Sequence, residues 1–210
     1  MLAPGFWRRL LQLNLGLMLF GLGIALMLKA GIGLDPWSVF HEGLANQTGL
    51  SFGRVTQLTG VLLIALSFAL LRVKPGLATV LNMLLVGPWV DFYRAQAWLP
   101  TAEGWLWGVL QFMAGVVLVG LASGLYIAAR FGAGPRDGFV LGLSLRLRLS
   151  VRLTRSGLEL LVLVSGFLLG GPLGLGTVLF AITVGYFMQR SLRLFRYQHG
   201  PVAPAASPAD

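Results

Sequence analysis

The sequence predicts an all-α polytopic membrane protein. We expect six transmembrane helices as two inverted three-helix repeats, each with a short half-membrane helix after a Gly-x-Gly break. The first observation is composition: the 210 residues are 56% hydrophobic and only 11% charged, too apolar for a soluble core. The second is a set of apolar segments close to the roughly 20 residues that a spanning helix needs. The third is a glycine-rich interruption that occurs in both halves of the chain.

The first apolar segment covers residues 10–30 and follows Arg8 and Arg9. It ends in Lys29 and a glycine turn, where a signal peptide would carry a small-residue cleavage site, so we expect a retained first helix. The other spans are expected at residues 55–71, 76–93, 104–131, 156–170 and 177–189. Residues 197–210 are rich in proline and alanine without periodicity, and are expected to form a disordered cytoplasmic tail.

The distribution of basic residues favours six spans with both termini in the cytoplasm. This topology places thirteen of the sixteen lysines and arginines inside, as the positive-inside rule requires. An eight-span alternative, in which the segments after the breaks also cross, places eleven inside. The segment at 36–47 contains His41, Glu42 and Asn46, and as a helix it covers about 18 Å of a core about 30 Å thick.

The two interruptions read "GIGLDPWSVF" (31–40) and "GAGPRDGFVL" (132–141). Placing Gly31 and Gly33 over Gly132 and Gly134 gives an offset of 101 residues. Further on, "TVLNMLLVG" (79–87) lies over "TVLFAITVG" (177–185) at an offset of 98. We therefore expect two repeats, residues 1–98 and 99–196. Because each holds three spans, the second must enter the membrane from the opposite face.

Each break predicts the start of a short helix. Asp35 is a natural N-cap and Pro36 suits the first helical turn, and Pro135 makes a similar start. A helix that begins inside a membrane protein offers free N–H groups to an anion or a carbonyl oxygen. The expected substrate-binding residues are Gly31, Gly33, Asp35, Pro36, Trp37, Gly132, Gly134, Pro135, Arg136 and Asp137. The alternative is a pair of tight turns at the bilayer surface, with Trp37 as an interfacial anchor.

The segment after the second break, "LGLSLRLRLSVRL", alternates apolar and polar residues as a strand would. An open strand in lipid leaves backbone groups unpaired. A short helix leading into an arginine-rich turn is therefore favoured.

A few polar residues stand out in the apolar segments. Glu159 is the acidic residue well inside a predicted span, which is costly unless it is paired or wet. It is a candidate coupling carboxylate; the alternative is an ion pair with Arg155. Four polar residues are expected to form interhelical hydrogen bonds: Asn14, Gln57, Asn82 and Gln111. Asp91, near an outer helix end, is expected to be solvated.

Composition argues against several function classes. The chain has no cysteine and two histidines, too few ligands for a thiolate or histidine metal site. No nucleophile has a base at a credible spacing, so we expect no enzyme, no cofactor and no metal. The net charge of +9 comes from arginines between apolar segments, which predicts no nucleic-acid partner. The expected partners are membrane lipids and a small-molecule substrate, and glycine-rich helix faces are compatible with a homodimer.

The motifs "GIGLDPW", "GAGPRDG" and "LLGGPLGLGT" resemble the YczE/YyaS/YitT group of bacterial integral membrane proteins, specifically its YczE-like branch. The resemblance covers residues 15–190, although the stretch after "GPRDG" is more arginine-rich here than the group's pattern. It implies a polytopic protein of the bacterial inner membrane and says little about activity beyond a suspected link to small-molecule export.

Two functions follow from this reading. The first is a secondary transporter or exporter of a small anionic or amphipathic molecule, with its site between the inverted repeats. The second is a non-transporting membrane scaffold or accessory protein, in which the breaks are only turns.

Overall fold

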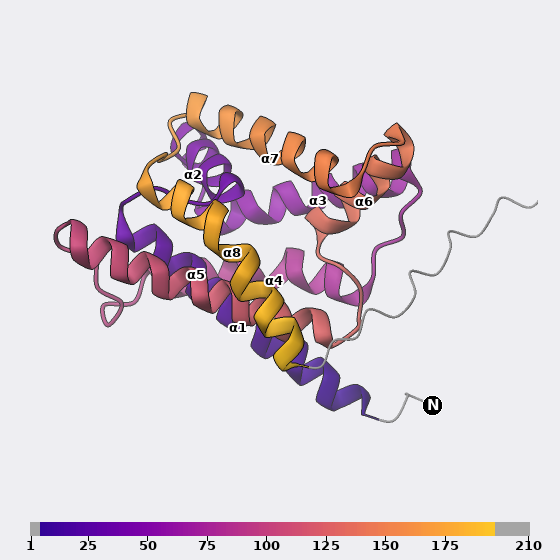
Figure 1. Cartoon of the computed structure of the whole chain (residues 1–210), viewed down its shortest axis with the longest axis horizontal. Coiled ribbons are helices and arrows are strands. Elements are labelled where there is room, and N and C mark those ends of the chain that lie inside the picture. Colours follow the sequence, from indigo (N-terminus) through magenta and orange to yellow (C-terminus); the bar gives the residue numbers. More distant parts are fainter. Residues whose placement is uncertain (1–4, 196–210) are drawn as a thin grey trace, which may run out of the picture.

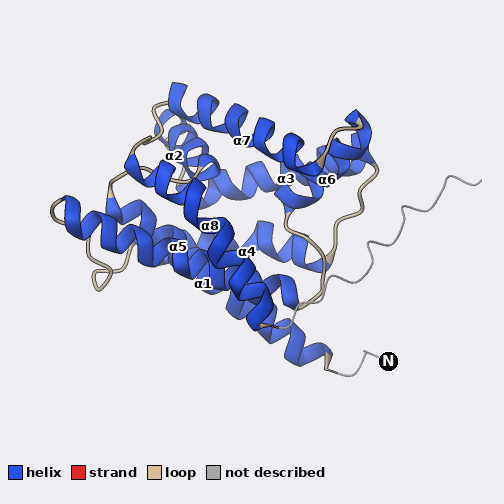
Figure 2. Cartoon of the chain, in the orientation of Figure 1, coloured by secondary structure: helices blue, strands red, loops and turns tan. Residues whose placement is uncertain are grey.

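The computed structural model describes residues 5–195, which form eight helices and no strand (Figure 2). The helices are α1 (Phe6–Ala30), α2 (Pro36–Thr48), α3 (Phe52–Leu71), α4 (Leu77–Arg94), α5 (Trp105–Ala128), α6 (Pro135–Leu147), α7 (Val151–Leu168) and α8 (Leu175–Leu194). The helical interpretation of the arginine-rich second segment is confirmed, since α6 and α7 cover most of it. The predicted tail at 197–210 lies outside the described residues.

The order of helix lengths is the same in both halves of the chain. A long helix (α1, α5) leads to a helix of 13 residues (α2, α6), and two further long helices follow. Pro36 and Pro135 begin the short helices, and the side chains of Ser51 and Ser150 cap α3 and α7. Pro135 follows Pro36 by 99 residues, and Ser150 follows Ser51 by the same number.

These helix starts correct the offset of 101 at the breaks. The matching of Gly31 with Gly132 is wrong by two residues: Gly33 and Gly132 share the same backbone conformation, with φ of 107° and 112°. Gly134 then takes the capping position that Asp35 holds in the first half. We call two residues counterparts when they occupy equivalent positions of the two halves. The offset is 99 residues between α1–α3 and α5–α7, and 98 residues between α4 and α8, as for Thr79 and Thr177.

The helices form two layers (Figure 1). In the first layer α1 packs on α5, with α4 beside α1 and α8 beside α5. In the second layer α2 packs on α7 and α3 on α6. The main contact between the layers is that of α3 with α4. The first layer contains most of the apolar core, including Leu17, Phe112 and Val116.

Helices α1 and α5 run antiparallel through small residues. A Cβ on Gly16 would lie within 3 Å of Tyr126, and one on Gly108 would lie close to the Ala30 carbonyl. Position 16 thus faces 126, and position 30 faces 108. Gly21 touches Trp89, and its counterpart Gly120 touches Phe187 in the same way. Glycine at such positions lets helices approach closely in a membrane.

The last helix of each half is hydrogen-bonded, through its first turn, to the break of the other half: α4 to the second break and α8 to the first. The Ala78 N–H in the first turn of α4 donates to the Phe131 carbonyl at 3.0 Å. The Gly176 N–H in the first turn of α8 donates to the Ile32 carbonyl at 2.7 Å. These amides have no partner within their own helix, so the exchange satisfies both helix starts and anchors both breaks.

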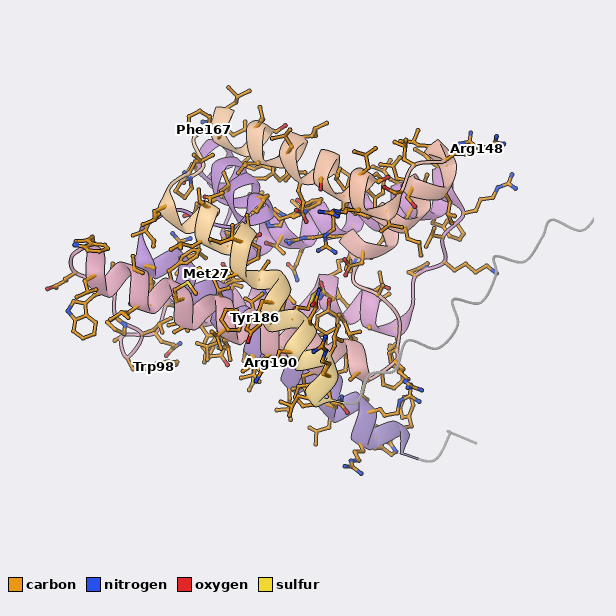
Figure 3. All side chains as sticks on the ribbon, in the orientation of Figure 1. Met27, Trp98, Arg148, Phe167, Tyr186 and Arg190 are labelled. Carbon is orange, nitrogen blue, oxygen red and sulfur yellow. The ribbon has the colours of Figure 1, made fainter. Side chains whose placement is uncertain are left out.

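The outer faces of the helices are apolar. Phe68, Leu161 and Ile182 are 60%, 63% and 69% exposed, and Phe167 lies at the edge of α7 (Figure 3). Three helices of the described chain, α1, α3 and α5, are long and apolar enough to cross a membrane. An extensive apolar surface of this kind suits lipid and not water.

Candidate functional site

The first break confirms the predicted helix start. Asp35 is 6% exposed, and its carboxylate accepts the Ser38 N–H at 3.2 Å, an N-cap that stabilises a helix by about 1 kcal/mol. Pro36 follows as the first helical residue. Asp35 therefore has a structural role in addition to the ligand contact that the sequence predicts for it.

The predicted glycines shape the turns. Gly31, Gly33 and Gly132 have positive φ, which a residue with a side chain adopts at a cost. Gly33 also lies against the backbone of Gly174, and Gly132 against Gly76. These residues are accounted for by the close approach of chains, and their contact with a substrate stays a prediction.

The two short helices meet through their second residues. Trp37 of α2 and Arg136 of α6 are counterparts, and the Arg136 guanidinium carbon lies 4.7 Å from the centre of the Trp37 ring. Trp37 is 7% exposed and packs with Leu63 of α3 and Val162 of α7, which are also counterparts. The structure thus brings together one predicted site residue from each break, in the middle of the second layer.

Arg136 keeps its hydrogen-bonding capacity. A guanidinium carries five N–H donors, yet Arg136 is partly buried and donates to no side chain or carbonyl of residues 5–195. Asp35 and Asp137 place carboxylates at the starts of the same two short helices. A cation that is stacked on an aromatic ring, with its donors free, is equipped to bind an oxygen-bearing group.

Polar groups from the first layer complete this region around Gly134. A Cβ at Gly134 would lie 3.6 Å from the Tyr126 hydroxyl, 3.6 Å from an Asp137 carboxylate oxygen and 3.8 Å from the Asn82 amide nitrogen. Tyr126 is 5% exposed. Asn82 and Tyr126 were not among the predicted site residues; the signal available in the sequence was a polar residue inside each of two apolar segments.

Glu159 forms the ion pair that the sequence offered as the alternative to a coupling role. The Arg155 Nε donates to Glu159 at 2.9 Å, and another Arg155 nitrogen lies 3.5 Å from Asp137. Arg155 thereby joins α6 to α7. Both carboxylates are 38% exposed at the side chain, so the group faces a partly open surface.

Two buried polar atoms near the first break have no partner within the described chain. The Ser38 hydroxyl is on a residue that is fully buried, and His41 is 1% exposed with its Nε2 unpaired. The other ring nitrogen of His41 lies 3.2 Å from the Thr56 hydroxyl. Unpaired buried polar atoms cost free energy, and they mark places where a ligand or water is favoured.

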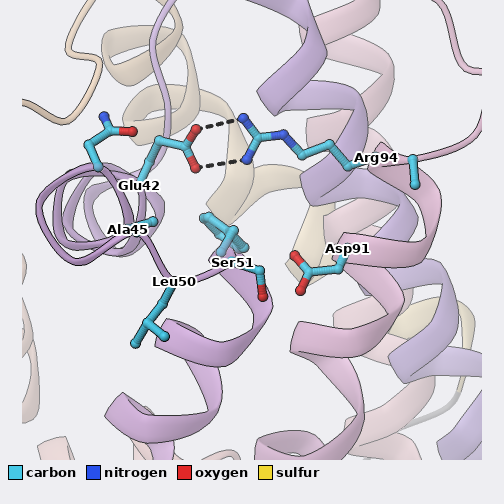
Figure 4. Close-up of a pocket in the computed structure, with 10 residues that line it drawn as sticks. Glu42, Ala45, Leu50, Ser51, Asp91 and Arg94 are labelled. Carbon is cyan, nitrogen blue, oxygen red and sulfur yellow. Dashed lines mark hydrogen bonds and ion pairs between the residues drawn. The ribbon is translucent and has the colours of Figure 1, made fainter.

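A second polar site lies where the C-terminal ends of α2 and α4 meet the start of α3 (Figure 4). Arg94 makes two hydrogen bonds, of 3.0 and 2.7 Å, to the Glu42 carboxylate. The pair borders a depression of about 440 Å³ lined by Glu42, Ala45, Asn46, Gly49, Leu50, Ser51, Phe52, Asp91, Arg94 and Ala95. In the sequence Glu42 argues only against a spanning segment, and its ion pair with Arg94 was not predicted.

The expectation for Asp91 was wrong. Its carboxylate is not merely solvated, because it accepts the Gly53 N–H at 2.9 Å. Gly53 lies in the first turn of α3, where N–H groups lack a partner and the helix dipole favours a negative charge. The predicted interhelical hydrogen bonds of Gln57 and Gln111 are confirmed, to the carbonyls of Leu84 and Leu26 respectively. The same prediction for Asn14 is wrong, because its amide donates to the Leu10 carbonyl of its own helix at 2.8 Å. The Asn82 side chain makes no hydrogen bond within residues 5–195.

The comparisons with known proteins agree on a family. A family model described as "Family of unknown function (DUF6198)" matches residues 7–193. The "Uncharacterized membrane protein YczE" of Bacillus subtilis (strain 168) is 33% identical over 178 residues, 84% of this chain and 82% of the relative. An "Uncharacterized protein" of Haemophilus influenzae is 36% identical over 187 residues, 88% of this chain and 84% of its own length.

A further relative, the "Uncharacterized protein YyaS" of Bacillus subtilis, is 27% identical over 172 residues, 79% of this chain and 83% of that protein. No solved structure matches the chain. The membrane relative agrees with the apolar helix surfaces and with the three helices long enough to span. The chain is therefore a membrane protein that belongs to the DUF6198 family, and it is similar to YczE.

Proposed function

We propose that the protein is a secondary transporter of a small amphipathic or anionic molecule in the bacterial inner membrane. Its site lies where Trp37 and Arg136 meet, between two inverted repeats. The observation that carries the proposal is this meeting of counterpart residues, with the guanidinium donors left free. Many secondary transporters place their site in this way, at broken helices between inverted repeats.

The directions of the helices support the inverted arrangement. Helix α5, the counterpart of α1, runs antiparallel to it, and the breaks are anchored reciprocally by α4 and α8. A two-fold axis perpendicular to the long helices produces this pattern. We take α1, α3, α4, α5, α7 and α8 as the six spans, with both termini on the cytoplasmic side, where most of the arginines lie.

The charges of the site support coupling to a proton or another cation. The carboxylates of Asp137 and Glu159 both lie within ion-pair distance of Arg155, and a third carboxylate, Asp35, and a second guanidinium, Arg136, belong to the starts of α2 and α6. If all five groups are ionised, one negative charge is in excess, which is costly inside a membrane protein. We propose Glu159 as the coupling carboxylate, which binds the coupling cation while Arg136 binds an anionic group of the substrate.

Cysteine accessibility tests the proposal, because the chain has no native cysteine. Ser38→Cys changes one atom at a fully buried position beside the first break. Gly134→Cys adds a side chain where the nearest atoms lie at ordinary contact distances. A transporter exposes both positions to water during its cycle, so we expect a membrane-impermeant maleimide to label them in intact cells or in inverted vesicles.

Ser191→Cys is the matched control, since Ser191 is 1% exposed and lies against Gly124, between α8 and α5 in the first layer. It should remain unlabelled. If Ser38→Cys and Gly134→Cys also resist the reagent from both faces, at acidic and at neutral pH, the site is dry. That result would overturn the transport proposal in favour of a membrane scaffold.

A further inference from the structure

Helix α3 is closely packed on α4 in the first half. Gly53 and Gly87 lie backbone to backbone, so that a Cβ on either would overlap the carbonyl of the other. About two turns further along α3, Gly60 lies against Met83, and the Gln57 amide between them donates to the Leu84 carbonyl at 2.9 Å. Nothing larger than glycine fits at these crossing points.

The equivalent helices α7 and α8 do not pack on each other along residues 151–194. They separate from the turn at residues 169–174 onward (Figure 1). Gly185, the counterpart of Gly87, has no described atom within 4 Å of the place of a Cβ, and Arg152, the counterpart of Gly53, is exposed. On one side of the molecule, α3 of the second layer thus packs on α4 of the first layer. On the other side, α7 and α8 do not pack on each other.

The closed side carries a latch that the open side lacks. The bidentate Glu42–Arg94 pair joins α2 to α4, and Asp91 holds the start of α3. The counterparts of Glu42 and Arg94 are Leu141 and Leu192, which cannot form such a pair. A short turn, residues 49–51, connects α2 to α3, so the latch restrains both helices.

We infer that the layer of α2, α3, α6 and α7 rocks on the layer of α1, α4, α5 and α8 between two conformations. In the described one, α3 rests on α4 and α7 is away from α8; in the other, α7 rests on α8 and α3 leaves α4. This motion would give the proposed transporter its two states, and its role in transport rests on the proposed function. The motion itself is inferred from the helix contacts alone. The contact of α7 with α8 is then looser than that of α3 with α4, because Arg152 and Glu159 occupy the positions equivalent to Gly53 and Gly60.

Disulfide crosslinking tests this in the full-length protein in membranes. Arg152→Cys with Gly185→Cys reproduces the Gly53–Gly87 contact in the second half, and we expect oxidation to join the pair although the two helices are apart here. Arg94→Ala breaks the latch and should raise the crosslinked fraction several-fold. Leu153→Cys with Gly185→Cys is the control, since Leu153 is the neighbouring exposed residue and its counterpart Arg54 faces outward.

A second pair, Ser156→Cys with Ile182→Cys, reproduces the neighbourhood of Gln57 and Leu84 and keeps the test decisive if one variant folds poorly. Crosslinking of the matched pairs above the control, increased by Arg94→Ala, supports the rocking motion. Equal yields in matched and control pairs, unchanged by Arg94→Ala, overturn it. If crosslinking fails while Ser38→Cys is labelled, the motion is wrong and the proposed site stands.

Discussion

The two halves of the chain have the same helix order but different side chains at the same places. Around the second break lie Tyr126 and Asn82; their counterparts are the apolar Met27 and Phe180. Conversely, the first half has glycines where α3 meets α4, while the second has Arg152 and Glu159 at the positions equivalent to Gly53 and Gly60. The two halves share the order of long and short helices, and these differences in side chains determine which side is closed and which is polar.

The comparison also explains why the breaks are stable. Each break is held by the helix start of the other half, so neither half satisfies its own backbone alone. Unpaired amides are costly where water is absent. The two halves are therefore expected to fold as one unit.

The largest expected difference in stability between the two halves is at the crossing of α3 and α4. Gly87→Leu should lower the free energy of unfolding by about 1–3 kcal/mol through overpacking against Gly53. Gly185→Leu should change it by much less, since that position is open. Thermal unfolding of both variants in detergent measures the difference; equal effects would show that the two crossings are alike.

A smaller difference is expected at the break anchors. The Thr79 hydroxyl donates to the Ala133 carbonyl at 2.6 Å and accepts the Gly76 N–H at 3.1 Å, whereas Thr177 accepts only the Gly174 N–H, at 3.4 Å. Thr79→Val should therefore cost about 1–2 kcal/mol and Thr177→Val about 0.5 kcal/mol. The same unfolding assay decides this, and a larger loss for Thr177→Val would contradict the described asymmetry.

The latch should contribute less to stability. Arg94→Ala is expected to cost at most about 1 kcal/mol, because the Arg94 side chain is 44% exposed and solvent screens the pair. The loss should shrink at high salt. Arg54→Ala is the control, since Arg54 is exposed and has no ion pair within residues 5–195; a salt-dependent loss of the same size there would remove the latch's special role.

The smallest effect on stability is expected for Glu159→Gln, about 0.3–0.5 kcal/mol, since the pair with Arg155 is an exposed pair one helical turn apart. Its effect on function should be larger. If Glu159 carries the coupling proton, the labelling of Ser38→Cys will depend on pH, and Glu159→Gln will abolish that dependence. An unchanged pH dependence would assign Glu159 a structural role only.

Much of this fold follows from local sequence signals. The helices, the N-cap at Asp35 and the helix start at Pro135 could be predicted, because apolar length, capping chemistry and proline act locally. The true offset at the breaks could not be predicted. The two Gly-x-Gly motifs align by residue type, whereas the residues that share a backbone conformation are Gly33 and Gly132. Tyr126, Asn82 and the Glu42–Arg94 pair join residues far apart in the chain, and no local pattern records such contacts.

The central claim is that the second layer closes on the first at α3 and α4 in one conformation and at α7 and α8 in the other. Electron–electron distance measurements in lipid nanodiscs test it directly, with spin labels on exposed counterpart pairs: Leu58 and Leu84 across α3 and α4, Gly157 and Ile182 across α7 and α8. We predict a short and a long distance for both pairs, with opposite populations, and a shift toward long α3–α4 and short α7–α8 distances in Arg94→Ala. A single distance in each pair, unmoved by Arg94→Ala, would contradict the account.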